Sequence, residues 1–431
     1  MTFHERRLKL ADTESVCPVC LATIPAERWA IGDEVRLVKT CPEHGRFSVP
    51  VWRGLASYSR WGAARHAHDR PVTTVTAVDR GCPHDCGLCP DHRQQSCCVL
   101  LEVTSRCDLA CPVCFASAGR HGTDASIDEI DRGLDALAAA GGRVQIRLSG
   151  GEPTVRDDLP DIVRRVRGRG FDLVRLDTNG IRLALEPDYV AALAAAGLDG
   201  VFLQFDGVDD EVHRRLRGAR LARLKDLAIA RCGEAGLGVV LVPTIVPGVD
   251  DRQIGAIVDH AIARMPTVRS VHFQPISHFG RVPHVPTDAD RITLPEIMAA
   301  LIRHSGGAIT LDDFHPGSAE NPFCSFSGRF AVDADGRLRA NGVPADLARS
   351  GAVAEVPEAF ARRAEMREPT LGLSGMAFQD AWTLDLERLR RCNIHVVAPD
   401  ARVIPFCAYN LTDRDGRSLH RAPARRSPAP A

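Results

Sequence analysis

The chain has 431 residues, of which 45% are hydrophobic and 25% charged, a composition typical of a globular protein with a large core. Its formal net charge of −1 argues against general nucleic-acid binding, because such proteins are usually basic. No apolar run approaches the ~20 residues that a membrane span needs, and the N-terminus lacks the apolar segment of a signal peptide. We therefore expect a cytoplasmic protein.

The cysteines are numerous and unevenly placed. Fifteen cysteines in a cytoplasmic protein indicate metal sites rather than disulfides. Most of them lie between Cys17 and Cys114, so we expect metal-bound units to precede a conventional core. The expected segments are a metal-binding ribbon (1–54), a linker helix (Leu55 to Arg70) with a cysteine-rich segment (55–98), a barrel (99–305), a C-terminal extension (306–420) and a disordered tail (421–431).

The first motif has the spacing C-x2-C followed by C-x2-H. It offers Cys17, Cys20, Cys41 and His44, with an alternating, hairpin-like stretch from Glu34 to Lys39 between the two pairs. Tetrahedral Zn²⁺ accepts three sulfurs and one imidazole at this spacing, and a mononuclear iron held by thiolates is the alternative. If His44 is instead a solvent-facing turn residue, a remote cysteine completes the site.

The second motif is C-x3-C-x2-C, formed by Cys82, Cys86 and Cys89, with two adjacent cysteines downstream. Together with Cys97 or Cys98, these residues would supply the four thiolates of an auxiliary iron–sulfur cluster. We favour Cys97, because Cys98 begins an apolar stretch that predicts a strand. A second zinc site is the alternative.

The third motif repeats C-x3-C-x2-C at Cys107, Cys111 and Cys114. Three closely spaced thiolates suit three corners of a cubane cluster. Because only three ligands are offered, one iron keeps an open position where a substrate or cosubstrate can bind.

From residue 99 to about 305, apolar strands alternate with amphipathic helices, and Ser126 and Glu129 form a capping box at the first helix. The predicted strands cover 99–103, 144–148, 171–176, 201–205, 238–242 and 271–274, and the helices 127–140, 157–167, 187–196, 208–235, 254–263 and 293–304. Six β/α units require a parallel sheet with right-handed crossovers. We therefore predict an α/β fold with a partial (β/α)6 TIM-type barrel whose site lies at the C-terminal strand ends.

After the second barrel strand comes Ser149-Gly150-Gly151-Glu152-Pro153. Strand, C-x3-C-x2-C, helix, strand, G-G-E-P is an order that resembles radical S-adenosylmethionine (SAM) enzymes. The resemblance implies a [4Fe–4S] cluster on Cys107, Cys111 and Cys114, SAM as cosubstrate, and a reductant such as ferredoxin or flavodoxin. In such enzymes, reductive cleavage of SAM yields a 5′-deoxyadenosyl radical.

The same resemblance suggests which residues hold SAM. Gly150 and Gly151 would let the backbone approach its methionine part, and Glu152, followed by Pro153, would pair with its ammonium group. The remaining candidates are polar residues at the next strand ends, for the amino acid, ribose or substrate: Thr178, Asn179, Gln204 and Asp206. Many members carry an aromatic residue at the position of Val113, whereas here the aromatic residue is Phe115, so stacking on adenine from position 113 is not expected.

Three cysteines remain near the C-terminus, at Cys324, Cys392 and Cys407. Their polar settings favour another auxiliary cluster, with His395 or a substrate atom as fourth ligand. Buried free thiols are the alternative, and this is what we expect of Cys232.

The arrangement as a whole resembles the radical SAM branch of tetraether lipid synthases and dihydropterin C-methylating proteins. The resemblance rests on C-P-x-C and T-C-P-E-H-G, then G-C-P-x-D-C-G-x-C-P, the C-P-V-C-F-A stretch, and I-P-F-C-A-Y-N. It implies hydrogen abstraction followed by C–C bond formation on a lipid chain. The alternative is methylation of a pterin-like ring with a folate methyl donor. A non-catalytic iron–sulfur or zinc protein is the reading from another class, and G-G-E-P argues against it.

Overall fold

A computed structural model describes residues 7–63, 70–74, 76–141, 144–317, 320–340 and 369–421. The predicted linker helix is observed as α1 (Leu55–Gly62), and the rest of the range predicted for it falls partly outside the described residues. The tail expected at 421–431 lies outside them except for Arg421. No helix among the described residues is long and apolar enough to cross a membrane.

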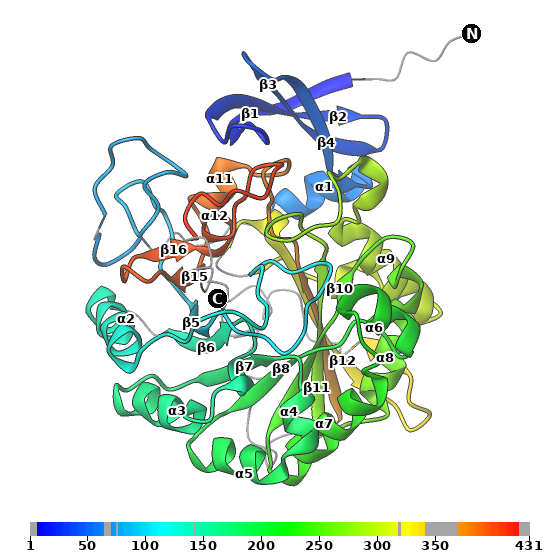
Figure 1. Ribbon diagram of the computed structural model, residues 1–431. Coiled ribbons are helices and arrows are strands. Elements are labelled where there is room, and N and C mark those ends of the chain that lie inside the picture. The colour runs from blue at the N-terminus through cyan, green and yellow to red at the C-terminus, as the bar shows by residue number, and fades with distance from the viewer. Residues whose placement is uncertain are drawn as a thin grey trace.

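The N-terminal unit is a four-stranded antiparallel sheet, which we call the ribbon; it appears in blue at one end of the molecule (Figure 1). Its strands follow one another in chain order: β1 (Arg7–Val16), β2 (Thr23–Ile31), β3 (Glu34–Cys41) and β4 (Gly45–Arg53). The alternation predicted from Glu34 to Lys39 lies within β3, where Val35 and Leu37 are buried and Arg36 is partly exposed.

Six parallel strands form the barrel wall, as predicted. They are β5 (Cys98–Thr104), β6 (Gln145–Gly150), β7 (Val174–Thr178), β8 (Gly200–Gln204), β9 (Gly238–Val242) and β11 (Val268–Pro275). Each is paired in parallel with the next along the chain, and the short β10 (Thr244–Ile245) pairs with β11. Figure 1 shows the helices on the outside of this wall.

The outer helices begin and end close to the predicted limits. They are α2 (Ile127–Ala140), α3 (Leu159–Gly168), α4 (Ile181–Leu185), α5 (Pro187–Ala195), α6 (Asp210–Arg217), α7 (Ala222–Glu234), α8 (Ile254–Ile262) and α9 (Leu294–His304). The predicted capping box at Ser126 and Glu129 is present. The helix predicted over 208–235 is two helices, because Gly218 adopts φ 78° and ends α6. The short α4 was not predicted.

The chain after residue 305 joins the barrel sheet at both of its edges. Beyond β11 lie β14 (Thr370–Met376), β12 (Ser325–Val332) and β13 (Leu338–Ala340), and beyond β5 lie β15 (Ile394–Val397) and β16 (Val403–Pro405). Strands β14 and β15 run parallel to their barrel neighbours. The C-terminal extension therefore widens the sheet, and its strands do not form a sheet of their own.

Short helical turns complete the fold. They are η1 (Pro153–Val155), η2 (Asp251–Gln253), η3 (Asp288–Asp290), η4 (Leu311–Asp313), η5 (Pro322–Cys324), α11 (Leu386–Leu389) and α12 (Phe406–Tyr409). Both α11 and α12 lie near the ribbon (Figure 1). Lys39 of the ribbon donates a 2.7 Å hydrogen bond to Ala381 O just before them, and Arg28 pairs with Glu387 at 2.5 Å. These contacts place the ribbon against the C-terminal segment.

Candidate active site

A cavity of about 210 Å³ opens at the C-terminal ends of the barrel strands, and Cys107, Cys111 and Cys114 all line it. The three cysteines lie on the loop that follows β5, which we call the cluster loop (105–123). The backbone of Cys114 exchanges two hydrogen bonds with Arg281, at 3.0 and 2.9 Å, and Arg281 Nε donates to Cys111 O at 2.7 Å. The loop is thus held from outside the predicted motif.

The donors of this loop fit an iron–sulfur cluster. The Leu109 amide donates to Cys107 Sγ at 3.4 Å, a contact that thiolates at clusters commonly receive. The three thiols lie near one another: after burial, Cys111 adds to the raised pKa of Cys107 and Cys114 to that of Cys111. Three neighbouring thiolates on one loop suit three corners of a cubane cluster.

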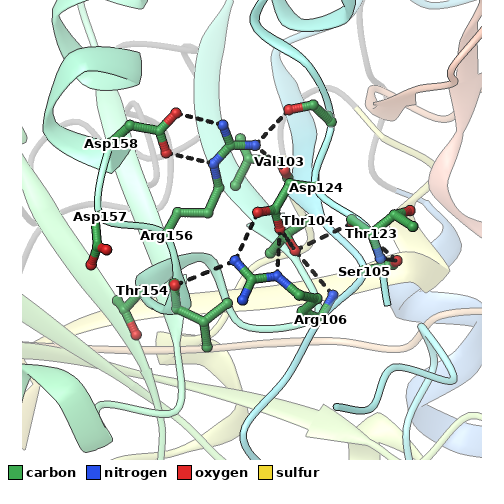
Figure 2. A network of polar contacts seen from close by, with 12 residues as sticks. Val103, Thr104, Ser105, Arg106, Thr123, Asp124, Thr154, Arg156, Asp157 and Asp158 are labelled. Atoms are coloured by element: carbon green, nitrogen blue, oxygen red, sulfur yellow. Dashed lines mark hydrogen bonds and ion pairs between the residues drawn. The ribbon is translucent and has the colours of Figure 1, made fainter. Parts of the chain in front are cut away.

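Both ends of the cluster loop are clamped by an arginine network (Figure 2). Arg106 gives Asp124 two hydrogen bonds, at 2.8 and 2.7 Å, and Thr104 Oγ1 donates to the same carboxylate at 2.6 Å. Arg156 donates to Val103 O at 2.8 Å. Because Arg106 directly precedes Cys107, this network holds the first cysteine in place on the end of β5.

Gly150 and Gly151 are needed for a reason that differs from the predicted one. A Cβ on Gly150 would overlap the carbonyl oxygen of Thr104, and one on Gly151 would overlap that of Arg106. Gly150 also adopts φ 127°, where side chains are rarely tolerated. The observed backbone contact is therefore with the cluster loop itself. The predicted approach to SAM stays a prediction.

Glu152 joins the G-G-E-P turn to the end of β7. Its side chain is buried, with 1% of the residue exposed. Oε1 accepts from Thr154 N and Oγ1 and from Thr178 Oγ1, and Oε2 accepts from Asn179 N at 2.6 Å. Burial raises the pKa of Glu152, and these hydrogen bonds oppose the rise. A carboxylate held this way keeps acceptor capacity on Oε2, at the edge of the cavity that it lines.

The other predicted contacts of SAM are themselves bonded within the protein. Asn179 Nδ2 donates to Asp108 Oδ1 at 2.6 Å, which connects β7 to the cluster loop. Gln204 accepts from Lys225 Nζ at 2.9 Å and bonds to Asp206. The cavity is lined by Thr178, Asn179 and Gln204, and its lining does not include Pro153 or Asp206.

Sequence reasoning missed Arg217 and Lys225, which α6 and α7 carry toward the cavity. Arg217 binds Asp206 through Nη2–Oδ1 and Nε–Oδ2 contacts of 2.6 and 2.7 Å. Burial works against its charge, but Asp206 holds the pKa of Arg217 above its usual range. Burial lowers the pKa of Lys225 to about 8. Arg217 also lies against Cys111. The signal available in the sequence was a basic residue in the first helix after the predicted strand-end residues Gln204 and Asp206.

Two charged residues that line the cavity and lie within strands β6 and β7, before their last residues, were also missed; we call their position the inner end of the cavity. Arg147 of β6 binds Asp177 of β7 at 2.6 Å, and its Cζ lies 4.0 Å from the centre of the Phe202 ring. All three residues line the cavity. Burial raises the pKa of Asp177, and the Arg147 guanidinium opposes the rise. The sequence signal that could have identified Arg147 and Asp177 is that both are charged residues within strands of a buried parallel sheet.

The ribbon brings together all four predicted metal ligands. Cys17, Cys20, Cys41 and His44 each place one ligand atom within 4.8 Å of the others. His44 Nδ1 lies 3.4 Å from Cys41 Sγ and 3.6 Å from Cys17 Sγ. His44 therefore occupies the position of the fourth metal ligand, which the alternative assigned to a remote cysteine. The set fits tetrahedral zinc.

The second cysteine motif surrounds a small cavity of about 10 Å³ lined by Cys82, Cys86 and Cys89. Cys98 begins β5, as predicted, and is buried. The cavity lining does not include Cys97. Cys392, however, adds to the raised pKa of Cys86 after Cys82, burial and Cys89. Cys97 as fourth ligand stays a prediction, and Cys392 is a second candidate that only the structure reveals.

The three C-terminal cysteines converge, although they are far apart in sequence. Burial raises the pKa of Cys407 to about 12, and Cys324 adds to the rise. Cys407 and Cys324 likewise raise that of Cys392, after burial. Arg388 Nη2 donates to Cys324 Sγ at 3.4 Å and the Gln379 amide to Cys407 Sγ at 3.3 Å. Cys232 lies in the core on α7, with 1% exposed.

Comparison with known proteins places these features in a family. Residues 101–261 match the radical SAM superfamily, and residues 9–53 match the HMPTM N-terminal zinc ribbon domain. The chain is 33% identical to the 7,8-dihydro-6-hydroxymethylpterin dimethyltransferase of Methanocaldococcus jannaschii, over 93% of this chain and 94% of that protein. It is 30% identical to the GTP 3′,8-cyclase of Chlorobaculum tepidum, over 56% of this chain and 76% of that protein.

Among solved structures, Streptococcus suis SuiB matches with a TM-score of 0.41 and 18% identity, over 49% of this chain and 46% of that one. The family is shown by the near full-length relative and by the match at residues 101–261, which includes the cluster loop and the G-G-E-P turn. The chain belongs to the radical SAM superfamily.

Proposed function

We propose that this protein is a radical SAM C-methyltransferase that acts on a pterin-like ring, with a folate as methyl donor. One observation carries the proposal: the 33% identity to a dihydropterin dimethyltransferase extends over 93% of this chain and 94% of that protein. The sequence alone favoured a lipid chain as substrate and kept the pterin ring as the alternative. The relative's name supports that alternative instead.

The cofactors of a radical SAM enzyme are a [4Fe–4S] cluster and SAM, and the ribbon adds a metal site. When bound and reduced, this pair supplies a carbon radical able to abstract hydrogen. The protein's own residues hold the reacting groups in place. Cys107, Cys111 and Cys114 are the proposed cluster ligands, and Glu152 and Asn179 position the G-G-E-P turn against the cluster loop.

The lining of the cavity also favours a compact ring, rather than an alkyl chain, as the substrate. One side is apolar and aromatic, with Phe279, Phe378 and Phe406 in the lining. Its inner end carries the Arg147–Asp177 ion pair. A hydrocarbon chain entering this end would desolvate two charges without offering a hydrogen bond, which is costly. A flat heterocycle can stack on the rings and pair with the charges.

Two further roles belong to the same proposal. The Cys82 motif and the C-terminal cysteines hold auxiliary [4Fe–4S] clusters, and a ferredoxin or flavodoxin supplies electrons. Radical SAM enzymes require a reductant, and the convergence of Cys324, Cys392 and Cys407 supports the second auxiliary site.

The test uses anaerobically reconstituted protein with SAM, dithionite, a methylated folate and 7,8-dihydro-6-hydroxymethylpterin. We expect 5′-deoxyadenosine and a pterin product heavier by one or two methyl groups, measured by mass spectrometry. Cys111→Ala should abolish both, and Cys232→Ala should abolish neither. Robust 5′-deoxyadenosine without any methylated pterin, together with hydrogen loss from a deuterated lipid chain, would overturn the proposal in favour of the lipid reading.

A further inference from the structure

The inner end of the cavity presents one carboxylate in a defined orientation. Arg147 Nε and Nη2 donate to the same oxygen of Asp177, Oδ1, at 2.9 and 2.6 Å. A carboxylate has about four acceptor positions, two on each oxygen. Both hydrogen bonds from Arg147 fall on Oδ1, so Oδ2 keeps acceptor capacity for a ligand.

The position of the Arg147–Asp177 ion pair indicates a role other than stabilising the fold. Desolvation commonly offsets the attraction within a buried pair, so apolar residues of similar size would stabilise the fold equally well. Barrel interiors at this depth are mostly filled with bulky apolar side chains. The Arg147 and Asp177 side chains keep 13% and 21% of their surface exposed. Both residues line the cavity, which is therefore where a ligand can meet them.

The surroundings make the pair rigid. Phe202 packs under the Arg147 guanidinium at 4.0 Å. Behind it, Arg175 is fully buried and donates to Gln145 Oε1 at 2.6 Å. His272 bonds to Ser374 at 2.9 Å across the neighbouring strands. Phe202 and the two hydrogen bonds to Oδ1 thus hold the pair in a defined orientation, which preorganises Asp177 for one geometry.

The chemistry of the proposed substrate matches this carboxylate. The pyrimidinone edge of a pterin carries two adjacent donors, the 2-amino group and N3–H, and Oδ2, the oxygen that Arg147 does not bond, has two acceptor positions that can receive both. Resting on the proposed function, we propose that Asp177 is the specificity-determining residue that recognises the 2-amino and N3–H groups of the pterin ring. The ring then lies in the cavity that Asp177 and the three cysteines of the cluster loop all line.

The experiment compares two substrates that differ at one position. The first is 7,8-dihydro-6-hydroxymethylpterin, and the second is its lumazine counterpart, in which an oxygen replaces the 2-amino group. That oxygen would face the Asp177 carboxylate with no proton between them. Sites built to bond a substrate N–H reject analogues that lack it strongly, so wild-type protein should prefer the pterin in kcat/KM by about 100-fold or more.

Asp177→Asn should reverse this order. With its oxygen kept on Arg147, the amide nitrogen of Asn takes the place of Oδ2 and can donate to the 2-oxo group. We expect the preference for the pterin to fall by at least about 100-fold and the lumazine to become the better substrate. Asp172→Asn is the matched control, because Asp172 is exposed just before the same strand, and it should keep the wild-type preference.

The outcomes separate this inference from the proposed function. If wild-type protein methylates both compounds equally well, or if Asp177→Asn keeps the wild-type order, the inference is wrong while the proposed function stands. If wild-type protein cleaves SAM but methylates and binds neither compound, the proposed function fails as well. The wild-type comparison needs no variant, so equal use of both compounds overturns the inference even if Asp177→Asn does not fold.

Discussion

The backbone amide of Gly151 donates a 2.8 Å hydrogen bond to the carbonyl oxygen of Thr104. This contact places the G-G-E-P turn directly on the cluster loop, and the next amide, that of Glu152, donates to Arg106 O at 2.8 Å. Two successive hydrogen bonds of this kind require a residue without a side chain at position 151. The glycine thus sets the position of the loop that carries all three proposed cluster cysteines.

Gly151→Ala should therefore displace the cluster loop. Its Cβ would overlap the Arg106 carbonyl, and misplacement by about 1 Å commonly costs on the order of 100-fold in rate. The measurement is 5′-deoxyadenosine formation with dithionite. Gly168→Ala, at the end of α3 with nothing within 4 Å of an added Cβ, should retain wild-type rates. Equal rates for the two variants would contradict the role assigned to Gly151.

Glu152→Gln should damage the site although it preserves shape. Oε1 accepts from Thr154 N and Oε2 from Asn179 N, so either orientation of the amide sets its NH₂ group against a backbone N–H. Leaving such a donor unsatisfied costs about 1–3 kcal/mol. We expect a lower thermal midpoint and a loss of SAM cleavage. Glu186→Gln, at an exposed pair with Arg182, is the control, and a wild-type midpoint for Glu152→Gln would refute the argument.

Asp250 predicts a specific pH dependence of stability. It is fully buried, and burial raises its pKa from 3.8 to about 8. Between these values the folded chain keeps a proton that the unfolded chain has lost. The free energy of unfolding therefore falls as pH rises, by up to about 1.4 kcal/mol per pH unit.

Asp250→Asn removes this dependence and keeps an acceptor for the Val246 amide, which donates to Oδ1 at 2.6 Å. Its thermal midpoint should exceed that of wild type increasingly from pH 5 to pH 8, and the difference should then level off. The exposed Asp172→Asn should show a constant offset. A midpoint difference that does not change with pH would show that Asp250 is ionised in the folded protein.

Cys407→Ala should remove one cluster's worth of iron. Cys324, Cys392 and Cys407 lie close enough that, after burial, they raise one another's pKa, and loss of one thiolate leaves too few ligands for a cluster. The measurement is iron and sulfide content after anaerobic reconstitution. Cys232→Ala, in the core of α7, should leave the iron content unchanged. Unchanged iron in Cys407→Ala would make the C-terminal cysteines structural thiols.

Cys41→Ser should release the ribbon metal without affecting the clusters. The four ribbon ligands form a separate group, so mass spectrometric metal analysis should show one zinc or one iron less per chain, with the cluster absorbance retained. The thermal midpoint should fall, because the ribbon packs on the C-terminal segment through Lys39 and Arg28. His284→Ala, with 57% of that side chain exposed, should change neither. Loss of cluster absorbance in Cys41→Ser would contradict this separation.

Local patterns were sufficient for much of the barrel. The strand predicted at 238–242 is β9, and the capping box at Ser126 is present, because periodicity and caps depend on residues a few positions apart. The strand predicted from residue 171 begins only at Val174. Its limits depend on where the neighbouring strand Gln145–Gly150 can pair, which a single segment does not reveal.

The sequence by itself determined that this protein belongs to the radical SAM class, because the spacing of Cys107, Cys111 and Cys114 and the G-G-E-P turn are local patterns. It did not determine the substrate, for which it favoured a lipid chain over the pterin ring that the near full-length relative supports. Tertiary structure alone decided how distant residues meet. It brought Arg217 to Asp206, Arg147 to Asp177 and Cys324 to Cys407, and it placed β14 and β15 on opposite edges of one sheet. These contacts depend on how the crossovers and the strand pairing arrange the elements in space, which no single segment of the sequence reveals.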